Sequence, residues 1–570
     1  MKSLKLVVGS VFLFLQCSSF NLYAASRAPV RAYHGIVVSD DPIAAHVGAE
    51  ILQHGGNAVD AAVAVAFTMA VTYPEAGNIG GGGFMVVRLA DGTTETIDFR
   101  EKAPAAATQT MYLDEHGNFL PEKSTYGHLS CGVPGSVAGL LFALEKFGTM
   151  KREDILQPAI TFAENGYMLT YEMAEKFKHV IPEFSKFPAS MKQFTKNGVP
   201  YAEGDTFRQP DLAATLRRIQ KEGRNGFYSG KTAEMIVAEM KRGARLPDGL
   251  ISKEDLLNYQ PVMREPVHGT YRGYGIISMG PSSSGGTALI QILNILEGYD
   301  LQSFRWHSAR EVHVLAEAMR RVFADRAEFL GDADFVKVPL HWLLSKKYAD
   351  ERRATIDSVM ASPSSSVSHG ILPRDESNQT THFSVVDKDG NCVGVTTTLN
   401  GLFGSKVVVD GAGFLLNNEM DDFSAKPGAP NMFGLVGGTA NAIAPGKRML
   451  SSMSPTIVLK EGKPFIVLGA RGGSRIITSV AQVIVNVIDF GMNIQEAVDA
   501  PRIHLQWLPD TLFAEERGLS PDTAEKLQAM GYNLDTHSYS AIVNAILIDA
   551  QHRVLLGAPD ARGGGEAAGY

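Results

Sequence analysis

Cysteines and metal-binding motifs are scarce in this sequence. Only three cysteines occur among 570 residues, and Cys17 lies in a leader-like N-terminal segment, which leaves Cys131 and Cys392. Both lie among small or apolar residues, so we expect two buried thiols, while a single disulfide between them stays open. No cysteine pair, HExxH motif or ligand-like histidine spacing occurs, and the sequence therefore predicts no metal site.

A basic tract is also missing. Lysine and arginine total 53 against 61 acidic residues, for a net charge of -8. An acidic chain without a basic cluster argues against nucleic acid as a partner. After the N-terminal segment, no stretch has the length and apolarity of a transmembrane helix. The composition, 45% hydrophobic and 20% charged, is that of a globular protein with a large core.

The first 25 residues have the pattern of a secretory leader. Two lysines precede an apolar run over Leu6–Leu15, and small residues suited to cleavage follow at Ala24 and Ala25. The run is too short to cross a hydrocarbon core of ~30 Å, which argues against a membrane anchor. A buried N-terminal helix is the other alternative. We expect residues 1–25 to be a cleaved signal peptide and the product to be periplasmic or secreted.

Alternating helix and strand patterns follow in the mature chain. Residues 41–56 predict a capped helix, and residues 57–74 a second helix that is apolar nearly all round and therefore buried. Residues 84–99 predict a hairpin, and residues 132–302 are mainly helical patterns. Residues 308–332 are the longest amphipathic helix pattern. Strand pairs between helices indicate antiparallel sheets packed against helices.

The most informative hairpin begins near Thr380. Residues 381–387 and 392–399 are strand patterns joined by a turn. A two- or three-residue loop places Thr380 opposite Leu399 or Thr398. Because neighbouring cross-strand side chains lie ~5 Å apart, a second hydroxyl could hold the first in one rotamer. Threonine is also a common strand residue, so this pattern alone favours an ordinary strand.

The segment before Thr380 indicates a cleavage site. Residues 357–374 are polar, serine-rich and interrupted by proline, as in exposed flexible segments. Cleavage of the Gln379–Thr380 bond would create an N-terminal threonine whose α-amine, with a pKa of ~7.7–8, can accept the hydroxyl proton. No histidine or aspartate partner is then required, which suits a sequence without a G-x-S-x-G motif.

Two glycines are candidates for the oxyanion hole of such a nucleophile. Gly472 and Gly473 follow an apolar strand and precede a helix that begins near Ser474. Backbone N–H groups at this turn could approach a tetrahedral oxygen, and a helix N-terminus favours negative charge. Most glycine pairs serve only as turns. The glycine-rich stretch 77–84 lacks the lysine and serine or threonine of a phosphate loop, so we expect a close-packed turn near the site.

Short blocks along the chain are typical of one protein family. In chain order they are GGNAVDAAVA, PEAGNIGGGGF, DFREKAP, GVPGSVAG, PSSSGGT, GDADF, SNQTTHFSVVDKDGN, LLNNEMDDFSAKPG, LSSMSPTIV, GGSRIITSV and APRIHLQWLPD. Together they resemble the bacterial γ-glutamyltranspeptidases, also called glutathione hydrolases. The resemblance spans nearly the whole mature chain, and many blocks in the same order are more specific than any one of them.

This resemblance implies a fold, a cleavage and a nucleophile. The fold is that of the N-terminal nucleophile hydrolases, an α+β sandwich of two antiparallel sheets between helix layers (αββα). Autocatalytic cleavage is expected to give a large subunit, residues 26–379, and a small catalytic subunit, residues 380–570, which stay together as a heterodimer. Thr380 is then the nucleophile in processing and turnover, and Thr398 resembles the second threonine that positions it. No cofactor is expected.

The resemblance also assigns the recognition of a glutamyl head group. Arg100 matches the arginine that pairs with the substrate α-carboxylate, a role that suits a planar guanidinium. Ser451 and Ser452 match hydroxyls that bind the same carboxylate. The groups that match those holding the α-ammonium are Asn400, Glu419 and Asp422.

Three positions depart from the family pattern. The loop 427–438 resembles the family's lid, in which Phe433 replaces a common tyrosine, so we expect a steric lid with one hydrogen bond fewer. Arg471 stands where proline is frequent, which adds a cation beside the oxyanion donors. Met449 also stands where proline is frequent. These departures bear on rate and acceptor preference more than on reaction class.

The implied activity is that of a γ-glutamyltransferase and glutathione hydrolase. Glutathione and other γ-glutamyl compounds would form a γ-glutamyl-Thr380 intermediate, which water or an amino acid or dipeptide acceptor then takes up. One alternative is a related acylase on the same fold, of the cephalosporin or glutaryl type, or a γ-polyglutamate-processing enzyme. Another is an inactive exported binding protein. The carboxylate pocket around Arg100 favours an unblocked glutamyl head.

Overall fold

Two antiparallel sheets of seven strands each form the centre of the protein. The computed structural model describes residues 26–243, 246–368 and 380–570. The predicted signal peptide and Gln379 lie outside these described residues. The first sheet has the order β1 (Val30–Ala32), β20 (Val554–Pro559), β19 (Ile542–Asp549), β15 (Lys463–Arg471), β14 (Thr456–Lys460), β11 (Tyr274–Ser278) and β10 (Val267–Tyr271). The second has the order β21 (Glu566–Gly569), β2 (Ile36–Ser39), β12 (Thr381–Val386), β13 (Cys392–Thr398), β3 (Gly82–Arg88), β4 (Thr94–Asp98) and β9 (Val262–Arg264).

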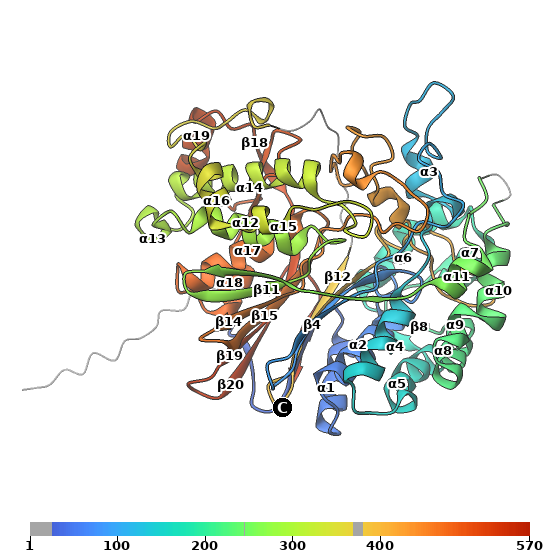
Figure 1. Cartoon of the computed structure of the whole chain (residues 1–570). Helices are drawn as coiled ribbons and strands as arrows, with labels where there is room; N and C mark the ends of the chain where they lie inside the picture. The colour runs from blue at the N-terminus through green and yellow to red at the C-terminus, as the bar shows by residue number, and fades with distance from the viewer. Residues whose placement is uncertain (1–25, 244–245, 369–379) are drawn as a thin grey trace, which may run out of the picture.

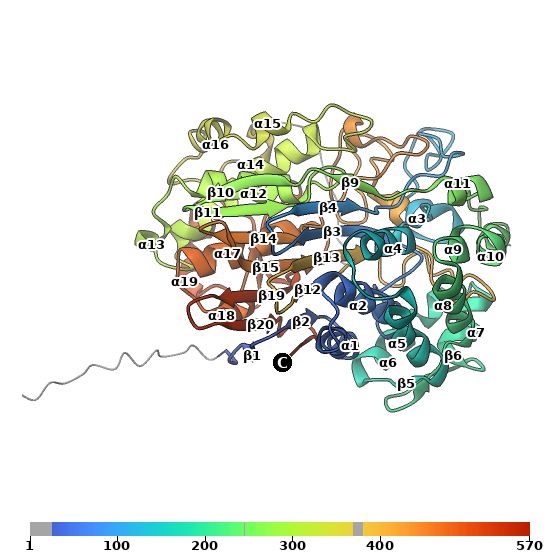
Figure 2. The ribbon, with the colours of Figure 1, turned by 60° about the horizontal axis from the view of Figure 1, so that its bottom comes forward.

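Helices cover the outer face of each sheet (Figures 1 and 2). The second sheet is covered by α1 (Pro42–Gln53), α2 (Ala58–Thr72), α4 (Ser136–Phe147) and α5 (Arg152–Asn165). The first sheet is covered by α12 (Gly285–Leu296), α14 (Ala309–Phe329), α17 (Arg475–Ile488) and α18 (Ile494–Asp499). Peripheral helices include α6 (Tyr171–Phe184), α8 (Pro210–Glu222) and α10 (Gly230–Glu239). The inner faces meet where β12 and β13 pack on β15 and β19, so the predicted αββα sandwich is confirmed.

Strands from before and after residue 380 alternate in both sheets. In the second sheet, β12 and β13 lie between β2 and β3. In the first sheet, β1 pairs with β20, and β11 pairs with β14. The two parts of the chain therefore share continuous hydrogen-bonded ladders and a common core, and neither part holds a complete sheet.

The predicted hairpin at Thr380 is confirmed, with the three-residue loop. Thr381 pairs with Thr397, and the Asp387 N–H donates to the Asn391 carbonyl at 3.1 Å. Gly390 closes the loop with φ of 89°, a left-handed conformation that glycine adopts without steric cost. Continuing this register places Thr380 opposite Thr398.

Other sequence predictions are confirmed or corrected by the fold. The helices predicted over 41–56 and 57–74 are α1 and α2, and every residue of α2 is buried. The prediction that residues 132–302 are mainly helical was incomplete, because β9, β10 and β11 arise there. Their short alternating patterns were hidden by longer helix patterns on both sides.

Cys131 and Cys392 are both free and buried, which excludes the disulfide.

The long helix α14 is buried nearly all round rather than along one stripe. Its buried residues include Glu317 and Arg321, which form an ion pair of 2.7 Å within the helix. Buried charges of opposite sign compensate one another, so charged residues of this amphipathic helix pattern can lie inside the protein. Among the described residues, no helix is both long enough and apolar enough to span a bilayer.

Candidate active site

One cavity gathers nearly all the predicted site residues. It has a volume of about 20 Å³, which is room for about one water molecule. Its lining residues are Arg100, Thr380, Thr398, Asn400, Glu419, Asp422, Phe433, Leu435, Ser451, Ser452, Met453, Gly473 and Ile476. Of the residues predicted from sequence, only Gly472 is absent from this wall. The sequence analysis gave no role to Leu435, Met453 and Ile476, which are apolar neighbours of the predicted site residues within the same quoted segments.

Thr380 lies directly before β12 and is 4% exposed. The next residue anchors it, because the Thr381 hydroxyl donates to Asp40 at 2.9 Å. Asn544 on β19 donates to the same carboxylate at 2.9 Å and to the His382 carbonyl at 2.8 Å. Both sheets therefore hold the backbone next to Thr380. A rigid strand end is a suitable support for a nucleophile, since catalytic geometry must be held closely.

Thr398 ends the paired strand β13. Its hydroxyl accepts the Asn400 N–H at 2.7 Å, and its carbonyl accepts the Asn78 side chain at 2.9 Å. Asn400 has φ of 73°, a left-handed conformation that turns the chain sharply after the strand. This turn directs Asn400 into the cavity, where its side-chain amide donates to the Asn418 carbonyl at 3.0 Å.

A buried charge cluster forms the polar end of the cavity. Arg100 lies 2.5 Å from Glu419, forms a short ion pair with Asp422, and lies 3.5 Å from Glu101. Burial acts to lower the pKa of Arg100, but Glu419 and Asp422 outweigh it, so the pKa lies above its usual value. Burial raises the pKa of both Glu419 and Asp422, although Arg100 opposes the shift. One permanent cation thus faces three carboxyl groups.

Two members of this cluster were missed from sequence. Glu101 follows Arg100 directly and is fully buried, and burial raises its pKa to about 8. Arg326 on α14 donates to the Ser452 hydroxyl at 3.3 Å and to the Ser284 hydroxyl at 2.9 Å. Burial lowers the pKa of Arg326 to about 10. The only available signal was local, namely a glutamate adjacent to Arg100 and an arginine at the end of a long helix.

Ser451 and Ser452 lie in a tightly bonded crossing of two chain segments. Ser451 exchanges backbone hydrogen bonds with the 282–284 segment, at 3.0 and 2.8 Å. The Ser284 hydroxyl also donates to the Ser451 carbonyl at 2.5 Å. The block PSSSGGT, noted from sequence without a role, therefore supports the two serines that line the cavity.

The glycine turn at 472–473 lies between β15 and α17. Gly473 has φ of 56° and lines the cavity, and a Cβ added there would lie 2.9 Å from the Phe433 ring. Gly472 has φ of 136° and packs against Ala541, where a Cβ would lie 2.8 Å from the Ala541 backbone. Both positions favour glycine because both have positive φ. A side chain at Gly473 would also contact the Phe433 ring, and one at Gly472 would contact the Ala541 backbone.

The predicted lid lies closed over the cavity. Phe433 is 4% exposed, and its carbonyl accepts a hydrogen bond from Gln506 at 3.2 Å. The loop is tied to the charge cluster, because Asn431 donates to Asp422 at 3.0 Å and the Met432 N–H donates to Asp421 at 2.8 Å. The γ-glutamyl group that the resemblance implies as substrate is much larger than one water molecule, so its entry requires this lid to move.

The cation that Arg471 adds directly before the glycine turn is paired with two carboxylates. Its guanidinium lies 3.1 Å from Glu75 and 3.3 Å from Asp40. Asp40 is also the carboxylate that anchors Thr381. The extra positive charge is therefore neutralised, and it ties the glycine turn to the strand that carries Thr380. Met449 is fully buried, and its carbonyl accepts from Arg100 at 3.4 Å.

The glycine-rich stretch 77–84 is a close-packed turn, as predicted. A Cβ at Gly81 would lie 2.0 Å from the Thr398 carbonyl, and a Cβ at Gly80 would lie 2.1 Å from the Leu415 carbonyl. The glycines thus let this loop lie against the strand end that forms the cavity. In the described part of the chain, no group of histidine, cysteine or acidic side chains is arranged to hold a metal ion.

The raised pKa of Glu101 leads to a pH prediction. Below about pH 8 the carboxyl is neutral, and above it a second negative charge appears beside Arg100. The family resemblance implies that Arg100 binds the α-carboxylate of a γ-glutamyl substrate. On that expectation the KM for such a substrate should rise as the pH increases through 8, because the new charge competes with the substrate carboxylate for the guanidinium. In the Glu101→Gln variant, KM is expected not to change with pH over the same range. Initial-rate measurements between about pH 6.5 and 9 test this.

Glu311 supplies the matched control for the pH prediction. Burial also raises its pKa to about 8, but it lies on α14 outside the cavity. The folded state keeps a proton on each group at pH values where the unfolded chain has lost it. Each of the two groups should therefore lower the free energy of unfolding by up to about 1.4 kcal/mol per pH unit as the pH rises from about 4.5 to 8. Glu311→Gln should reduce this slope but leave the KM profile unchanged, and a flat wild-type KM profile would contradict the role of Glu101.

The lid phenylalanine gives a second prediction. Phe433→Tyr restores a hydroxyl at the rim of the closed lid, and one net hydrogen bond contributes about 1 kcal/mol, or about fivefold in rate or equilibrium. We expect the ratio of transfer to hydrolysis to change by about this factor, because a firmer lid opens less readily to an acceptor. Phe335→Tyr, at a 49% exposed position, is the control. Unchanged hydrolysis and transfer rates in Phe433→Tyr would show that the missing hydroxyl has no effect.

Comparisons with known proteins agree with this geometry. A family model described as Gamma-glutamyltranspeptidase matches residues 44–570. A glutathione hydrolase proenzyme of Pseudomonas sp. (strain A14) is 50% identical over 537 residues, which cover 94% of this chain and 92% of the relative. The crystal structure of cephalosporin acylase from Bacillus halodurans matches with a TM-score of 0.84 at 28% identity, over 98% of this chain and 99% of that chain. The crystal structure of Helicobacter pylori gamma-glutamyltranspeptidase matches with a TM-score of 0.56 at 49% identity, over 57% of this chain and 93% of that chain.

Proposed function

The chain belongs to the γ-glutamyltranspeptidase family, and from this premise we propose how its own residues carry out the reaction. It is a γ-glutamyltransferase and glutathione hydrolase with the N-terminal nucleophile hydrolase fold. Its substrates are γ-glutamyl compounds. The cleavage site, the subunit boundaries and the roles of individual residues are the proposal.

Maturation begins with removal of residues 1–25 on export to the periplasm or medium. The Gln379–Thr380 bond then breaks autocatalytically, giving fragments 26–379 and 380–570. The alternation of strands from both fragments in each sheet supports a stable heterodimer, because separating them would expose two incomplete sheets. The position of Thr380 at the start of β12, in the wall of the cavity, supports this bond as the cleavage site.

Turnover uses the new N-terminal threonine. The Thr380 hydroxyl attacks the γ-amide carbonyl while its own α-amine accepts the proton and passes it to the leaving amine, for example cysteinylglycine from glutathione. Backbone N–H groups at Gly472 and Gly473 stabilise the tetrahedral oxygen, and Thr398 positions the nucleophile. Water then hydrolyses the ester, or an amino acid or dipeptide captures the γ-glutamyl group. The reaction uses no cofactor.

Recognition uses the charge cluster. The substrate α-carboxylate binds Arg100, Ser451 and Ser452, and the α-ammonium binds a second set of groups. That second set consists of Asn400, Glu419 and Asp422. In the closed cavity, Arg100 is paired with protein carboxylates. A zwitterionic head can enter such a pair without net change of charge, since its carboxylate takes the guanidinium and its ammonium takes the released carboxylates.

One observation carries this proposal, namely that Arg100, Glu419 and Asp422 form a buried ion cluster in the same cavity as Thr380. An acylase for uncharged or glutaryl side chains needs no anionic partners for an ammonium group. Rates with γ-glutamyl p-nitroanilide and glutaryl p-nitroanilide separate the two activities. N-terminal sequencing of the small fragment tests the cleavage site, and a first residue other than Thr380 would refute the proposed nucleophile.

A further inference from the structure

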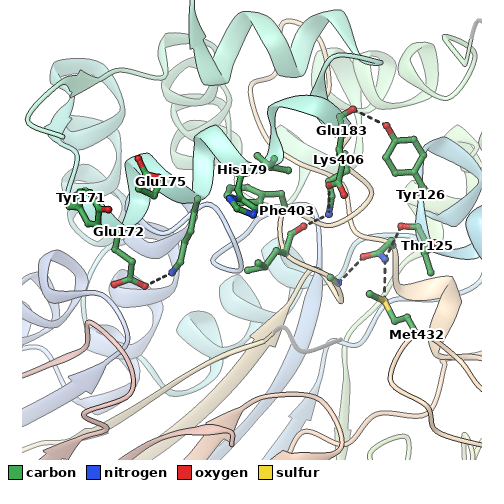
Figure 3. A pocket seen from close by; sticks show the side chains of 15 residues that line it. Thr125, Tyr126, Tyr171, Glu172, Glu175, His179, Glu183, Phe403, Lys406 and Met432 are labelled. Atoms are coloured by element: carbon green, nitrogen blue, oxygen red, sulfur yellow. Dashed lines mark hydrogen bonds and ion pairs between the residues drawn. The ribbon is translucent and has the colours of Figure 1, made fainter. Parts of the chain in front are cut away.

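A second cavity, of about 920 Å³, lies beside the lid (Figure 3). Its wall includes Met432, the residue directly before Phe433. The acidic side chains that helix α6 contributes to this wall each pair with a lysine. These pairs are Glu172 with Lys176, Glu175 with Lys178, and Glu183 with Lys406. The acidic groups of this cavity therefore already have partners within the protein.

Arg326, near the end of α14, has hydroxyl groups as its hydrogen-bond partners. Its Nε donates to the Ser284 hydroxyl at 2.9 Å, and its Nη2 donates to the Ser452 hydroxyl at 3.3 Å. The residue is 4% exposed, and burial lowers its pKa to about 10, although Asp422 opposes the shift. The guanidinium therefore stays protonated at neutral pH. A buried positive charge thus lies directly behind a serine that lines the catalytic cavity.

Chemistry fixes the direction of the hydrogen bonds at the two cavity serines. A guanidinium has only donors, so the Ser452 oxygen accepts from Arg326 and the single hydroxyl proton remains for another acceptor. Ser451 is held in the same way, because its hydroxyl oxygen accepts the Met453 N–H at 3.1 Å. Both serines line the catalytic cavity. Their hydroxyls are therefore available as donors to a ligand there, and an anion, which offers only acceptors, satisfies both.

Ser284 extends the same direction to the backbone of Ser451. Its hydroxyl accepts from Arg326 at 2.9 Å and donates to the Ser451 carbonyl at 2.5 Å. A hydroxyl has one proton, so the bond to this carbonyl uses the donor capacity of Ser284. Arg326 therefore holds both cavity serines, since it binds the Ser452 hydroxyl directly and reaches Ser451 through Ser284.

We propose that Arg326 is a positioning residue for the α-carboxylate of the γ-glutamyl donor and determines the preference for a donor that carries this group. The inference rests on the proposed function, because it takes Ser451 and Ser452 as partners of that carboxylate. Arg326 keeps both hydroxyls as donors, and its charge stabilises the bound anion, since Coulomb attraction is strong in a site from which water is excluded. Arg100 would contact the carboxylate directly, whereas Arg326 acts through the serines.

Two donors that differ in the carboxylate test this role. γ-Glutamyl p-nitroanilide carries the group, and γ-aminobutyryl p-nitroanilide keeps the amine but lacks the carboxylate. In Arg326→Met we expect kcat/KM for the first donor to fall by about tenfold to a hundredfold, mainly through KM, because hydrogen bonds to a charged group are weakened. With the second donor the change should be less than about twofold, because the group that Arg326 serves is missing. Where the second donor turns over slowly, its Ki against the first gives the same comparison.

Two further variants test the path through the serines. Arg326→Lys keeps the charge but loses the planar fork that reaches both Ser284 and Ser452, so its loss with the γ-glutamyl donor should be smaller than that of Arg326→Met. Ser284→Ala leaves the charge in place and removes only the link to Ser451. We expect a loss of about fivefold with the γ-glutamyl donor, the value of one hydrogen bond, and no loss with the γ-aminobutyryl donor.

Arg321→Met is the matched control, because Arg321 is a buried arginine on the same helix. It is 1% exposed and donates to Glu317 and to the Thr355 hydroxyl, both at 2.7 Å, away from the cavity lining. Its loss can lower stability, but the ratio of kcat/KM for the two donors should stay at the wild-type value. Cleavage into two fragments on a denaturing gel identifies the variants that fold.

The ratio between the two donors decides the outcome. Equal losses with both donors in an Arg326 variant would show a merely structural role and would overturn the proposal. If Arg326→Met fails to fold, Arg326→Lys and Ser284→Ala give the same comparison, and a wild-type ratio in Ser284→Ala would also overturn it. Absence of γ-glutamyl hydrolysis in the wild type would instead refute the proposed function.

Discussion

A Thr380→Ala variant is expected to remain a single polypeptide and to lose γ-glutamyl hydrolysis. The wild type should give bands near about 38 and 21 kDa on a denaturing gel, from the fragment lengths and ordinary residue mass. Without the hydroxyl there is no group to attack either the Gln379–Thr380 bond or the substrate, and removal of a catalytic nucleophile lowers kcat by at least about 10⁴-fold. The gel and the p-nitroanilide assay measure the two effects separately.

Two further variants separate chemistry from packing at this position. Thr380 is buried, so loss of its methyl group could disturb the strand end. Thr380→Val keeps the shape without the hydroxyl and should behave like the alanine variant. Thr380→Ser keeps the hydroxyl and, after cleavage, the α-amine, and should still be cut and active. If Thr380→Val were uncleaved and fully active, the Thr380 hydroxyl could not be the nucleophile and its α-amine could not be the base.

Replacement of Arg100 is expected to have the second largest effect. The guanidinium is 1% exposed and is the partner of Glu419 and Asp422. In Arg100→Met, catalytic efficiency should fall by about a thousandfold, because a desolvated charge pair with the substrate carboxylate is lost. The carboxylates left behind should lower the free energy of unfolding by about 3–5 kcal/mol, unless they take up protons. Initial rates and denaturant unfolding measure the two losses.

A double variant distinguishes binding from stability at this cluster. Arg100→Met with Glu419→Gln removes one charge of each sign and should recover much of the lost stability, since uncharged groups tolerate burial better. It should not recover activity, because no guanidinium remains for the substrate. Arg100→Lys keeps the charge but loses the planar fork, so its efficiency should be intermediate. Normal KM in Arg100→Met would place the substrate carboxylate elsewhere.

The charge cluster and the predicted lid are in direct contact, which on the proposed mechanism couples substrate binding to lid movement. Asn431 of the lid donates to Asp422, and Asp422 pairs with Arg100. A substrate that draws Arg100 toward its own carboxylate therefore weakens one of the contacts that hold the lid. On the proposed mechanism, substrate binding would therefore contribute to lid movement. Arg100 and Asp422, once separated from each other, would find new partners in the carboxylate and ammonium groups of the substrate.

Much of the site was predictable from sequence because it arises from local patterns. Turn chemistry and strand periodicity, which act over a few residues, predicted the hairpin and limited the partner of Thr380 to Leu399 or Thr398. The structure then showed the register that places Thr398 opposite. Local patterns also predicted the glycine turn before α17 and the capped helix α1. The remaining site residues came from a resemblance carried by many ordered blocks. Their assembly in one cavity agrees with that resemblance.

Other features were not accessible from sequence, because they depend on pairings between distant segments. Arg100 meets Asp422 across 322 positions, and Arg326 meets Ser452 across 126. Arg471 looked like an added cation, yet Glu75 and Asp40 neutralise it across nearly the whole chain. The strands β9 to β11 were hidden because runs of 3 to 5 residues carry little periodic signal until a neighbouring strand pairs with them.

By itself the sequence determined the strand pairs packed against helices and the hairpin that begins near Thr380, since these follow from hydrogen bonding and apolar periodicity along neighbouring residues. The αββα layers and the candidate nucleophile came from the resemblance of many ordered blocks to one family. Only the tertiary structure decided which charges surround Arg100, how far the lid closes, and that a second cavity is lined by Met432. The physical reason is that burial and Coulomb energy depend on which side chains the packed sheets bring together, and one stretch of chain does not contain that information.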